Sequence, residues 1–459
     1  MLCGIESIAR VRLVVAGVLL TGLALPSACK SDESSDTDDE DGEGGAGEGG
    51  RGGGGQSGGG AAGKSGGNGG SGGSEPSGGA GGKAEGAGGN GGQGGSMGGS
   101  GGTAGGGSGG SAGAGGAAMG GMGGTPMAMD YFVYTSGGGS IERFSFNAET
   151  GMLTSLGVTA LSGNTTYLSA RPGGTNLYAT NESSTGTVTA LKIARGTGQL
   201  TAQSSKPTDG ALAVHSHVHP SGKWLFVSNY NGANVRVFPL EDADGDLGDP
   251  TDTQPTGAES HQIMPDPSGK GVFVPCRGPN KVYQFLFNET TGKLTKNTPD
   301  SVDSVDPRHI AFHPSGKFAF LVNENMSTVV SFAYDAASGK LQNPKSVSLA
   351  GENAGSHIEV TPDGKFVYAG GRTTNTIYGF SINQDTGALT EVTKATQNIA
   401  NPRNFTVAPT GKHLLVANQN AGTIKVFSIA SDGKLTPLAG TTATVGGVKR
   451  VIVVPVPKP

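Results

Sequence analysis

The sequence predicts an all-β fold, a seven-bladed β-propeller of four-stranded antiparallel blades over residues 127–459. A turn motif, in which Pro is followed by a small or polar residue and Gly, recurs every 47 or 48 residues, for example 314 − 267 = 47. Its prolines are Pro172, Pro220, Pro267, Pro314, Pro362 and Pro409. A second turn, Gly-x-Leu, ends each unit at Leu153, Leu200, Leu247, Leu294, Leu341, Leu389 and Leu435. This period is the size of one propeller blade, and seven copies leave no room for another domain.

Residues 1–29 have the pattern of a bacterial signal peptide. Arg10 and Arg12 precede an apolar run at 13–25. At about 13 residues this run is too short to span a bilayer but fits a signal-peptide core. The stretch LPSAC at 25–29 is similar to a lipoprotein cleavage box, although Pro26 departs from its usual apolar residue. We therefore expect lipidation of Cys29 and attachment to the cell envelope as a lipoprotein; the alternative is a soluble secreted or periplasmic protein.

Residues 30–126 predict a tether. The segment is acidic up to residue 41, and residues 42–124 hold more than half of the 86 glycines. Such a segment has no apolar surface to offset the entropy of ordering it. We expect a coil with an end-to-end distance on the order of 50 Å, which would hold the folded domain away from a membrane.

Charge and cysteine content exclude some functions. The formal net charge of −5 arises in the first 129 residues, so the predicted propeller carries nearly equal numbers of basic and acidic residues. No basic stripe suggests nucleic acid. If Cys3 leaves with the signal and Cys29 is lipidated, Cys276 remains alone and no intrachain disulfide is expected. We expect a monomer that contacts a membrane only through the anchor at Cys29.

The unit beginning at Pro307 shows how one blade is built. Strands are predicted at 309–313, 318–322 and 329–334, with a fourth after Leu341. The chain enters at residues 131–134, which match the second strand of a unit and have no first strand before them. Residues 448–454 (VKRVIVV) fall where a further first strand would begin. We therefore expect the C-terminal strand to complete the N-terminal blade and close the ring.

Three segments resemble the seven-bladed lactonase family, whose best-known members resemble bacterial 6-phosphogluconolactonase. They are 219–240 (HPSGKWLFVSNYNGANVRVFPL), 306–325 (DPRHIAFHPSGKFAFLVNEN) and 401–429 (NPRNFTVAPTGKHLLVANQNAGTIKVFSI). The likeness covers residues 130–459. It implies hydrolysis of a sugar-derived or other anionic lactone, with no metal and no cofactor.

The variable face of the propeller predicts the site. Loops entering first strands and loops joining second to third strands open on the same face. These loops carry His215, His261, Arg277, Arg308, His309, Glu324, His357, Arg372, Arg403 and Gln419, as well as Glu182 and Tyr230. Lactone opening needs a base for water, an oxyanion donor and cations for an anionic ligand. Glu324 or His309 is the expected base and Arg308 its oxyanion partner. The ligand-binding candidates are His215, His261, Arg277, His357, Glu359, Arg372, Arg403 and Gln419.

Structural roles compete with these assignments. Glu324 could be an ion-pair partner of Arg308 or Arg372, the histidines could bond loop carbonyls, and Arg308 and Arg403 could brace blades. The alternate histidines at 215, 217 and 219 permit a metal interpretation, but the match of His219 to His313 before the turn proline favours a turn role. Asp242, Asp244, Asp246 and Asp249 lie in a surface turn, so a solvated acidic loop is favoured over calcium.

Two departures from the family pattern leave the substrate open. His357-Ile358-Glu359 reverses the family's usual Glu-Ile-His order, and Cys276-Arg277 stands where Asp-Leu is common. Export also argues against 6-phosphogluconolactone, which is made and used inside cells. The leading prediction is an exported lactone hydrolase. The alternatives are a non-catalytic surface propeller that binds a ligand or protein, and a muconate-type cycloisomerase.

Overall fold

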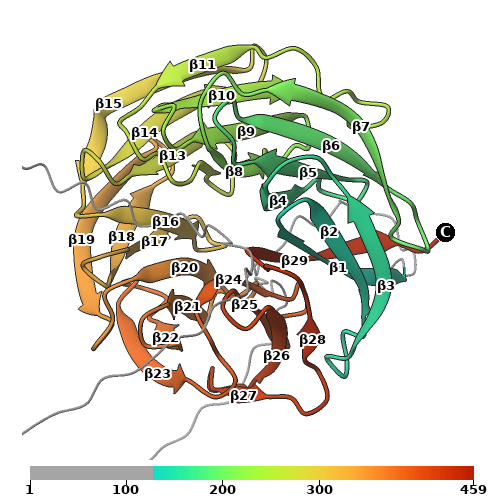
Figure 1. The fold of residues 1–459 in the computed structure, drawn as a ribbon. Coiled ribbons are helices and arrows are strands. Elements are labelled where there is room, and N and C mark those ends of the chain that lie inside the picture. Colours follow the sequence, from blue (N-terminus) through green and yellow to red (C-terminus); the bar gives the residue numbers. More distant parts are fainter. Residues whose placement is uncertain (1–127) are drawn as a thin grey trace, which may run out of the picture. The chain divides into compact units, whose positions relative to one another are not determined.

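A computed structural model describes residues 128–459, which form seven antiparallel sheets around a common centre (Figure 1). The predicted signal peptide, the lipidation site Cys29 and the whole predicted tether lie outside the described residues. No helix within 128–459 is long and apolar enough to cross a membrane. The seven-bladed, all-β prediction is confirmed.

In six of the seven blades the strands follow one another in the chain, with the first strand next to the centre and the fourth at the rim (Figure 1). Blade 2 comprises β4 (Thr165–Ala170), β5 (Asn176–Asn181), β6 (Thr187–Ile193) and β7 (Leu200–Pro207). Blade 3 comprises β8 (Ala213–Val218), β9 (Trp224–Asn229), β10 (Asn234–Pro239) and β11 (Asp252–Pro255). Blade 4 comprises β12 (Met264–Pro265), β13 (Gly271–Cys276), β14 (Lys281–Asn288) and β15 (Lys293–Asp303).

The remaining blades repeat this arrangement. Blade 5 comprises β16 (Pro307–Phe312), β17 (Phe318–Asn323), β18 (Thr328–Asp335) and β19 (Lys340–Ser348). Blade 6 comprises β20 (Gly355–Val360), β21 (Phe366–Gly371), β22 (Thr376–Ile382) and β23 (Leu389–Ala395). Blade 7 comprises β24 (Pro402–Val407), β25 (His413–Asn418), β26 (Thr423–Ile429) and β27 (Leu435–Pro437), with β28 (Ala443–Thr444) also paired to β26.

The ring closes by the predicted route. Blade 1 takes β1 (Met129–Gly137), β2 (Ser140–Phe146) and β3 (Leu153–Ala160) from the beginning of the domain and β29 (Arg450–Pro457) from its end. The first strand, β29, runs antiparallel to β1, with Val133 opposite Val453. Pairing the two ends of the domain covers the edge that β1 would otherwise expose.

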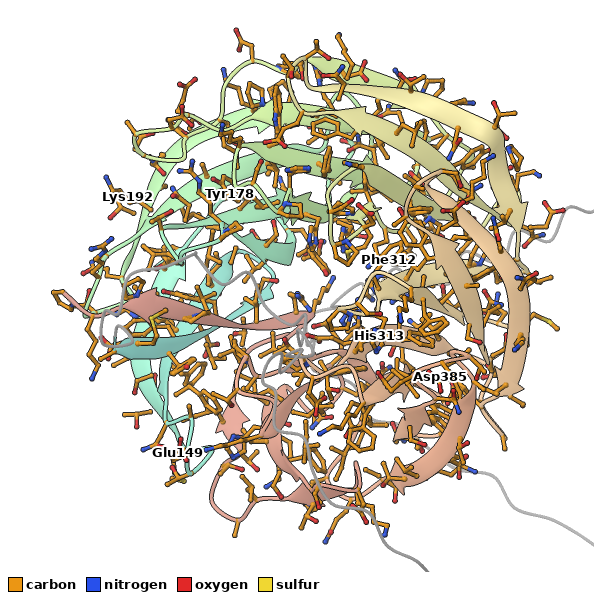
Figure 2. The ribbon with its side chains drawn as sticks, turned by 180° about the vertical axis from the view of Figure 1, so that it is seen from behind. Glu149, Tyr178, Lys192, Phe312, His313 and Asp385 are labelled. Atoms are coloured by element: carbon orange, nitrogen blue, oxygen red, sulfur yellow. The ribbon has the colours of Figure 1, made fainter. Side chains whose placement is uncertain are left out.

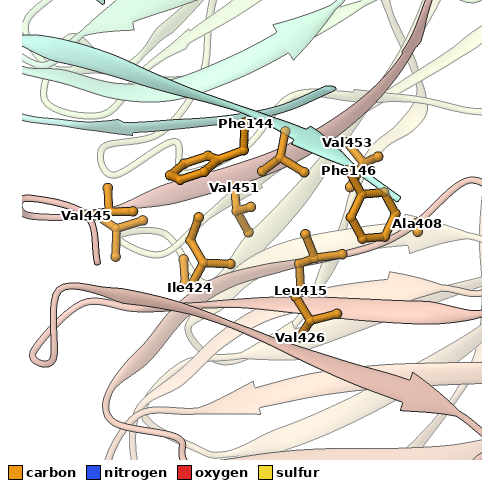
Figure 3. Close-up of a cluster of buried hydrophobic side chains, with 12 residues drawn as sticks. Phe144, Phe146, Ala408, Leu415, Ile424, Val426, Val445, Val451 and Val453 are labelled. Atoms are coloured by element: carbon orange, nitrogen blue, oxygen red, sulfur yellow. The ribbon is translucent and has the colours of Figure 1, made fainter. Parts of the chain in front are cut away.

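Hydrophobic clusters hold neighbouring blades together. Figure 3 shows one cluster, in which Phe144 and Phe146 of β2 pack with Val451 and Val453 of β29 and with Leu415 of blade 7. Alternate residues of each strand supply such clusters because successive side chains point to opposite faces. In Figure 2, Lys192 and Glu149 lie at the rim, whereas Phe312 and His313 lie closer to the centre. The packed blades leave the polar residues of the first strands to line the axis.

Candidate functional site

A β-bulge at the start of most first strands brings two consecutive side chains to the axis. In β16 the pairing register with β17 shifts between Pro307 and His309, so Arg308 is the extra residue. β4, β8, β20 and β24 shift at the equivalent place. Such bulges re-aim side chains, and they are common next to active sites. Two layers of axial residues result, one from each of the consecutive positions.

We call the layer at the position of His309 the axial ring. Its members are Tyr167, His215, Gln262, His309, His357, Asn404 and Arg450. Nδ1 of His309 lies 2.8 Å from Nδ1 of His357. Nη1 of Arg450 donates to Oδ1 of Asn404 at 2.7 Å, and its guanidinium lies 4.6 Å from the ring centroid of Tyr167. The ring of Tyr167 lies 4.1 Å from that of His215. Side chains from all seven blades thus meet at the axis.

We call the layer one residue earlier the mouth tier. Its members are Thr166, Val214, His261, Arg308, Ser356, Arg403 and Lys449. All of them except Ser356 line a cavity, together with Tyr167, His309 and Asn404 of the axial ring and Glu182 of the β5–β6 loop. The cations of this cavity are Arg308, Arg403 and Lys449, against one carboxylate, Glu182. An anionic ligand therefore matches the charge of the cavity.

Glu324 is enclosed by three arginines, one from its own blade and one from each neighbouring blade. Its carboxylate pairs with Nη1 of Arg277 at 3.0 Å, with Nε of Arg308 at 3.4 Å and with Nη2 of Arg372. The Glu324 side chain is 5% exposed and does not line the cavity. Arg277 also donates to the hydroxyl of Tyr230 at 3.1 Å. These contacts agree with the alternative interpretation in which Glu324 is an ion-pair partner of arginines.

Burial keeps four histidines of the axial ring and the mouth tier neutral. It lowers the pKa of His215, His261, His309 and His357 well below the usual value, and the positive charge of Arg308 acts in the same direction on all four. Arg403 adds to this effect on the pKa of His261. A neutral imidazole has a free lone pair on one ring nitrogen, so at neutral pH it can accept a hydrogen bond from a water molecule. His261 and His309 are the two of these histidines that line the cavity.

The structure brings most of the predicted site residues together. His261, Arg308, His309 and Arg403 line the cavity, while Arg277 and Arg372 lie behind it on Glu324. His215 and His357 belong to the axial ring but do not line the cavity. Gln419 lies outside the cavity in the β25–β26 loop, where its N–H bonds the carbonyl of Asn401. Glu359 lies two residues beyond the axial ring, on the side away from the mouth tier.

Six cavity residues were missing from the predicted site: Thr166, Tyr167, Glu182, Val214, Asn404 and Lys449. Glu182 was predicted only to lie in a loop on the same face, and the predicted site included neither Tyr167 nor Lys449. The repeat itself carries the signal for Lys449, because it stands 141 residues, three repeats of 47, after Arg308. The closing strand follows the last turn motif, and only its role in closing the ring was predicted.

Residues of the two segments that permit a metal interpretation, 215–219 and 242–249, form hydrogen bonds within the protein. Nδ1 of His219 accepts from the N–H of Ser221 at 3.1 Å, and Nε2 lies 3.1 Å from the carbonyl oxygen of Gly269, which is the expected turn role. Asp246 accepts from the N–H groups of Ser204 and Leu247. No group of three or more His, Cys, Asp or Glu side chains in residues 128–459 is arranged to hold a metal ion.

Comparison with known proteins places the chain among lactonases. Residues 132–453 match the family described as lactonase, 7-bladed beta-propeller. A 6-phosphogluconolactonase from Bacillus subtilis is 30% identical over 28% of this chain, and one from Formosa agariphila is 30% identical over 23%. These alignments span 38% and 31% of the two relatives, about a third of their length.

Solved structures share the whole propeller. A putative 6-phosphogluconolactonase from Bacteroides fragilis has a TM-score of 0.65 and 28% identity, covering 71% of this chain and 98% of its own. A periplasmic gluconolactonase from Pseudomonas aeruginosa has a TM-score of 0.66 and 25% identity, covering 72% of this chain and all of its own. The family match spans most of the chain, and the ring of seven blades agrees with it. The chain therefore belongs to the lactonase family of seven-bladed β-propellers.

Proposed function

We propose that this protein is an exported lactone hydrolase that opens a sugar-derived or other anionic lactone without a metal. The observation that carries the proposal is the cavity at the axis, where Arg308, Arg403 and Lys449 stand beside the neutral imidazoles of His261 and His309. This set combines anion binding with a proton acceptor, which is what lactone opening requires.

His309 is the better base of the two candidates suggested by the sequence. It lines the cavity, whereas the carboxylate of Glu324 is ion-paired with three arginines and does not. We therefore assign Glu324 the role of holding Arg308 in place. With Nδ1 of His309 directed at His357, Nε2 is the ring nitrogen that remains for a water molecule in the cavity.

The reaction follows from these positions. Water attacks the lactone carbonyl carbon while its proton passes to Nε2 of His309, and Arg308 stabilises the negative charge on the carbonyl oxygen. The ring C–O bond then breaks, and the leaving oxygen takes the proton back from His309. The product is a hydroxy acid, whose carboxylate the cations of the cavity can also bind.

The proposed location and substrate support each other. Residues 1–29 have the pattern of an export signal with a lipidation site at Cys29, and a similar structure is a periplasmic gluconolactonase. An exported enzyme meets lactones of unphosphorylated sugars or sugar acids more readily than 6-phosphogluconolactone. We propose that a lipid anchor at Cys29 attaches the enzyme to the cell envelope and that it works as a monomer.

A lactone panel tests the proposal. The purified protein should open glucono-δ-lactone or a sugar-acid lactone faster than buffer, followed by acid release at constant pH. His309→Gln and Arg308→Gln should each lower kcat/KM about 10²-fold or more. Arg195→Gln, an exposed arginine outside the cavity, is the matched control. Absence of turnover over the whole panel would support a ligand-binding propeller. Turnover of a muconate would support a cycloisomerase.

A further inference from the structure

We propose that Glu359 and His357 are positioning residues that form a proton relay with His309, and that this relay sets which nitrogen of His309 faces the cavity as a base. The inference rests on the proposed hydrolase function, in which His309 takes the proton from water. It assigns roles to two residues that do not line the cavity themselves.

The relay runs between two adjacent first strands. Nδ1 of His309 on β16 lies 2.8 Å from Nδ1 of His357 on β20. Nε2 of His357 lies 3.7 Å from Oε2 of Glu359. The two side chains point to the same face of the strand because they are two residues apart. That distance is too long for a direct hydrogen bond but is within ion-pair range. Oε2 is buried and has no hydrogen-bond partner among the described residues, and Nε2 of His357 lies within ion-pair range of it.

The geometry determines where the protons lie. A contact between two Nδ1 atoms at 2.8 Å requires one donor and one acceptor, and both rings are neutral. The carboxylate of Glu359 favours the proton of His357 on Nε2, which makes Nδ1 of His357 the acceptor. His309 must then carry its proton on Nδ1, which leaves a lone pair on Nε2. The hydrogen bond at one ring nitrogen thus fixes the chemistry of the other.

Charged and titratable groups surround the relay on several strands. Arg450 on β29 acts on both Glu359 and His357, and Arg308 acts on both histidines. His215 and His261 face His309, and Tyr167 lies near Glu359. Thr406 on β24 donates to Oε1 of Glu359 at 3.4 Å. Burial raises the pKa of Glu359 to about 7, against the opposing effect of Arg450.

This pKa makes the relay reversible with pH. Below about pH 7, the protonated Glu359 carboxyl can donate to Nε2 of His357. His357 then donates from Nδ1, and His309 must place its proton on Nε2, where it can no longer accept one from water. Because the pKa of His309 is well below the usual value, its own protonation does not account for a change near pH 7.

The carboxylate occurs at this level of the axis only in blade 6. The equivalent positions of the other blades hold Ser169, His217, Met264, Ala311, Thr406 and Ile452. The order His357-Ile358-Glu359 therefore places one acid beneath the histidine that contacts His309. The repeat does not require an acid at this position.

Nitrogen NMR of histidines reads the relay directly. The full-length protein, labelled with ¹⁵N at its 8 histidines, should show His309 protonated on Nδ1 at pH 8. His219 and His313 are internal standards of the opposite tautomer, because their Nδ1 atoms accept from the N–H groups of Ser221 and Ser315. Finding His309 protonated on Nε2 at pH 8 would overturn the relay.

Replacement of the carboxylate gives the second readout. Glu359→Leu should convert His309 to a mixture of tautomers. Glu352→Gln, which changes a carboxylate of the β19–β20 loop held by backbone N–H groups, should not. An unchanged His309 spectrum in Glu359→Leu would contradict the proposal. If that variant does not fold, the wild-type protein still decides: His309 should be protonated on Nδ1 at pH 8, and the opposite tautomer there would refute the relay.

Kinetics separate the relay from the proposed function. In Glu359→Leu, kcat should fall about 10- to 100-fold with little change in KM, and the ionisation of kcat near pH 7 should disappear. A protein without lactonase activity but with the predicted His309 tautomer would refute the hydrolase and leave the relay standing. Full activity with the opposite tautomer would refute the relay and leave the hydrolase standing.

Discussion

Glu324 shows how one side chain can organise a site without performing its chemistry. Three guanidinium groups surround its carboxylate, and the side chains of Arg277 and Arg308 are 18% and 3% exposed. A carboxylate held by these contacts does not line the cavity, so it cannot take a proton from a water molecule there. The same contacts hold Arg308 where it can reach the cavity. This division of work places the base on His309.

The first prediction concerns the stability that Glu324 provides. Glu324→Gln removes the negative charge between the arginines, and breaking a buried ion pair costs about 3–5 kcal/mol. We expect a fall of about 3 kcal/mol in the free energy of unfolding, measured by urea denaturation. Glu259→Gln is the matched control: Glu259 is 39% exposed and lies 3.8 Å from Arg277, so its loss should cost less than about 1 kcal/mol. Equal effects of both changes would contradict this role of Glu324.

The second prediction concerns Lys449. It lies in the mouth tier beside Arg403 and lines the cavity, so its ammonium should attract anionic lactones. Lys449→Met should raise KM for a lactone carrying a carboxylate about 10-fold and leave kcat almost unchanged. The KM for neutral glucono-δ-lactone should not change. A uniform loss of kcat for both substrates would show that Lys449 acts in the chemical step.

For single residues, the sequence predicted which side chains lie near the site better than it predicted the partners that they contact. The repeat register shows that Arg308, His309 and Arg403 begin first strands, and a ring must bring such positions together. It cannot show that Arg277 and Arg372 turn towards Glu324 rather than into the cavity, because long side chains have several rotamers that reach different partners. The 2.8 Å contact between His309 and His357 depends on ring orientation and was equally hidden.

Among the elements, the bulged first strand is the one that builds the site. Regular alternation would aim Arg308 and His309 to opposite faces of the blade. The bulge at Arg308 turns both to the axis, while Ile310 enters the hydrophobic packing between blades. The strand boundaries predicted for this blade agree with the structure within one or two residues. The bulge itself was not predicted, because no glycine or proline at position 308 marks it.

The third prediction concerns the closing strand β29. It pairs with β1 along its whole length and supplies Val451 and Val453 to one core cluster and Val454 and Val456 to another. A chain ending at residue 447 should lose the cooperative thermal transition measured by circular dichroism, since β1 and two clusters become exposed. Removal of only Lys458 and Pro459 should leave the transition unchanged. A cooperative transition in the shorter chain would show that six complete blades suffice.

For the whole molecule, the period of 47 residues carried most of the information about the fold. Each blade buries its faces only against its neighbours, so the number of units and the place of closure follow from counting repeats. The axial ring is a consequence of the same symmetry, since equivalent positions of all seven blades meet there. Its polar composition sets a property of the whole domain, the response of its stability to acid.

The fourth prediction is a steep loss of stability below pH 6.5. His215, His309 and His357 stay neutral in the folded protein, because their pKa values are well below the usual value, but bind protons when unfolded. Glu359 has the opposite effect. Between pH 4.5 and 7 its raised pKa keeps it protonated in the folded protein only, so it releases one proton on unfolding. From these four groups alone, unfolding takes up a net two protons, so stability should fall by at least about 3 kcal/mol per pH unit on acidification.

Gln262 supplies the matched variant for this measurement. Its Oε1 accepts the N–H of Ile310, just as Nδ1 of His215 faces the N–H of Ile263, so glutamine fits an axial-ring position. The free energy of unfolding of the wild type and of His215→Gln is measured with urea at several pH values from 5 to 8. Its slope against pH should be smaller in the variant by about one proton, or 1.4 kcal/mol per pH unit. Because His217 and His261 also have lowered pKa values, the wild-type slope should not fall below two protons. Stability that does not change between pH 8 and pH 5 would mean that the axial histidines are not kept neutral by burial.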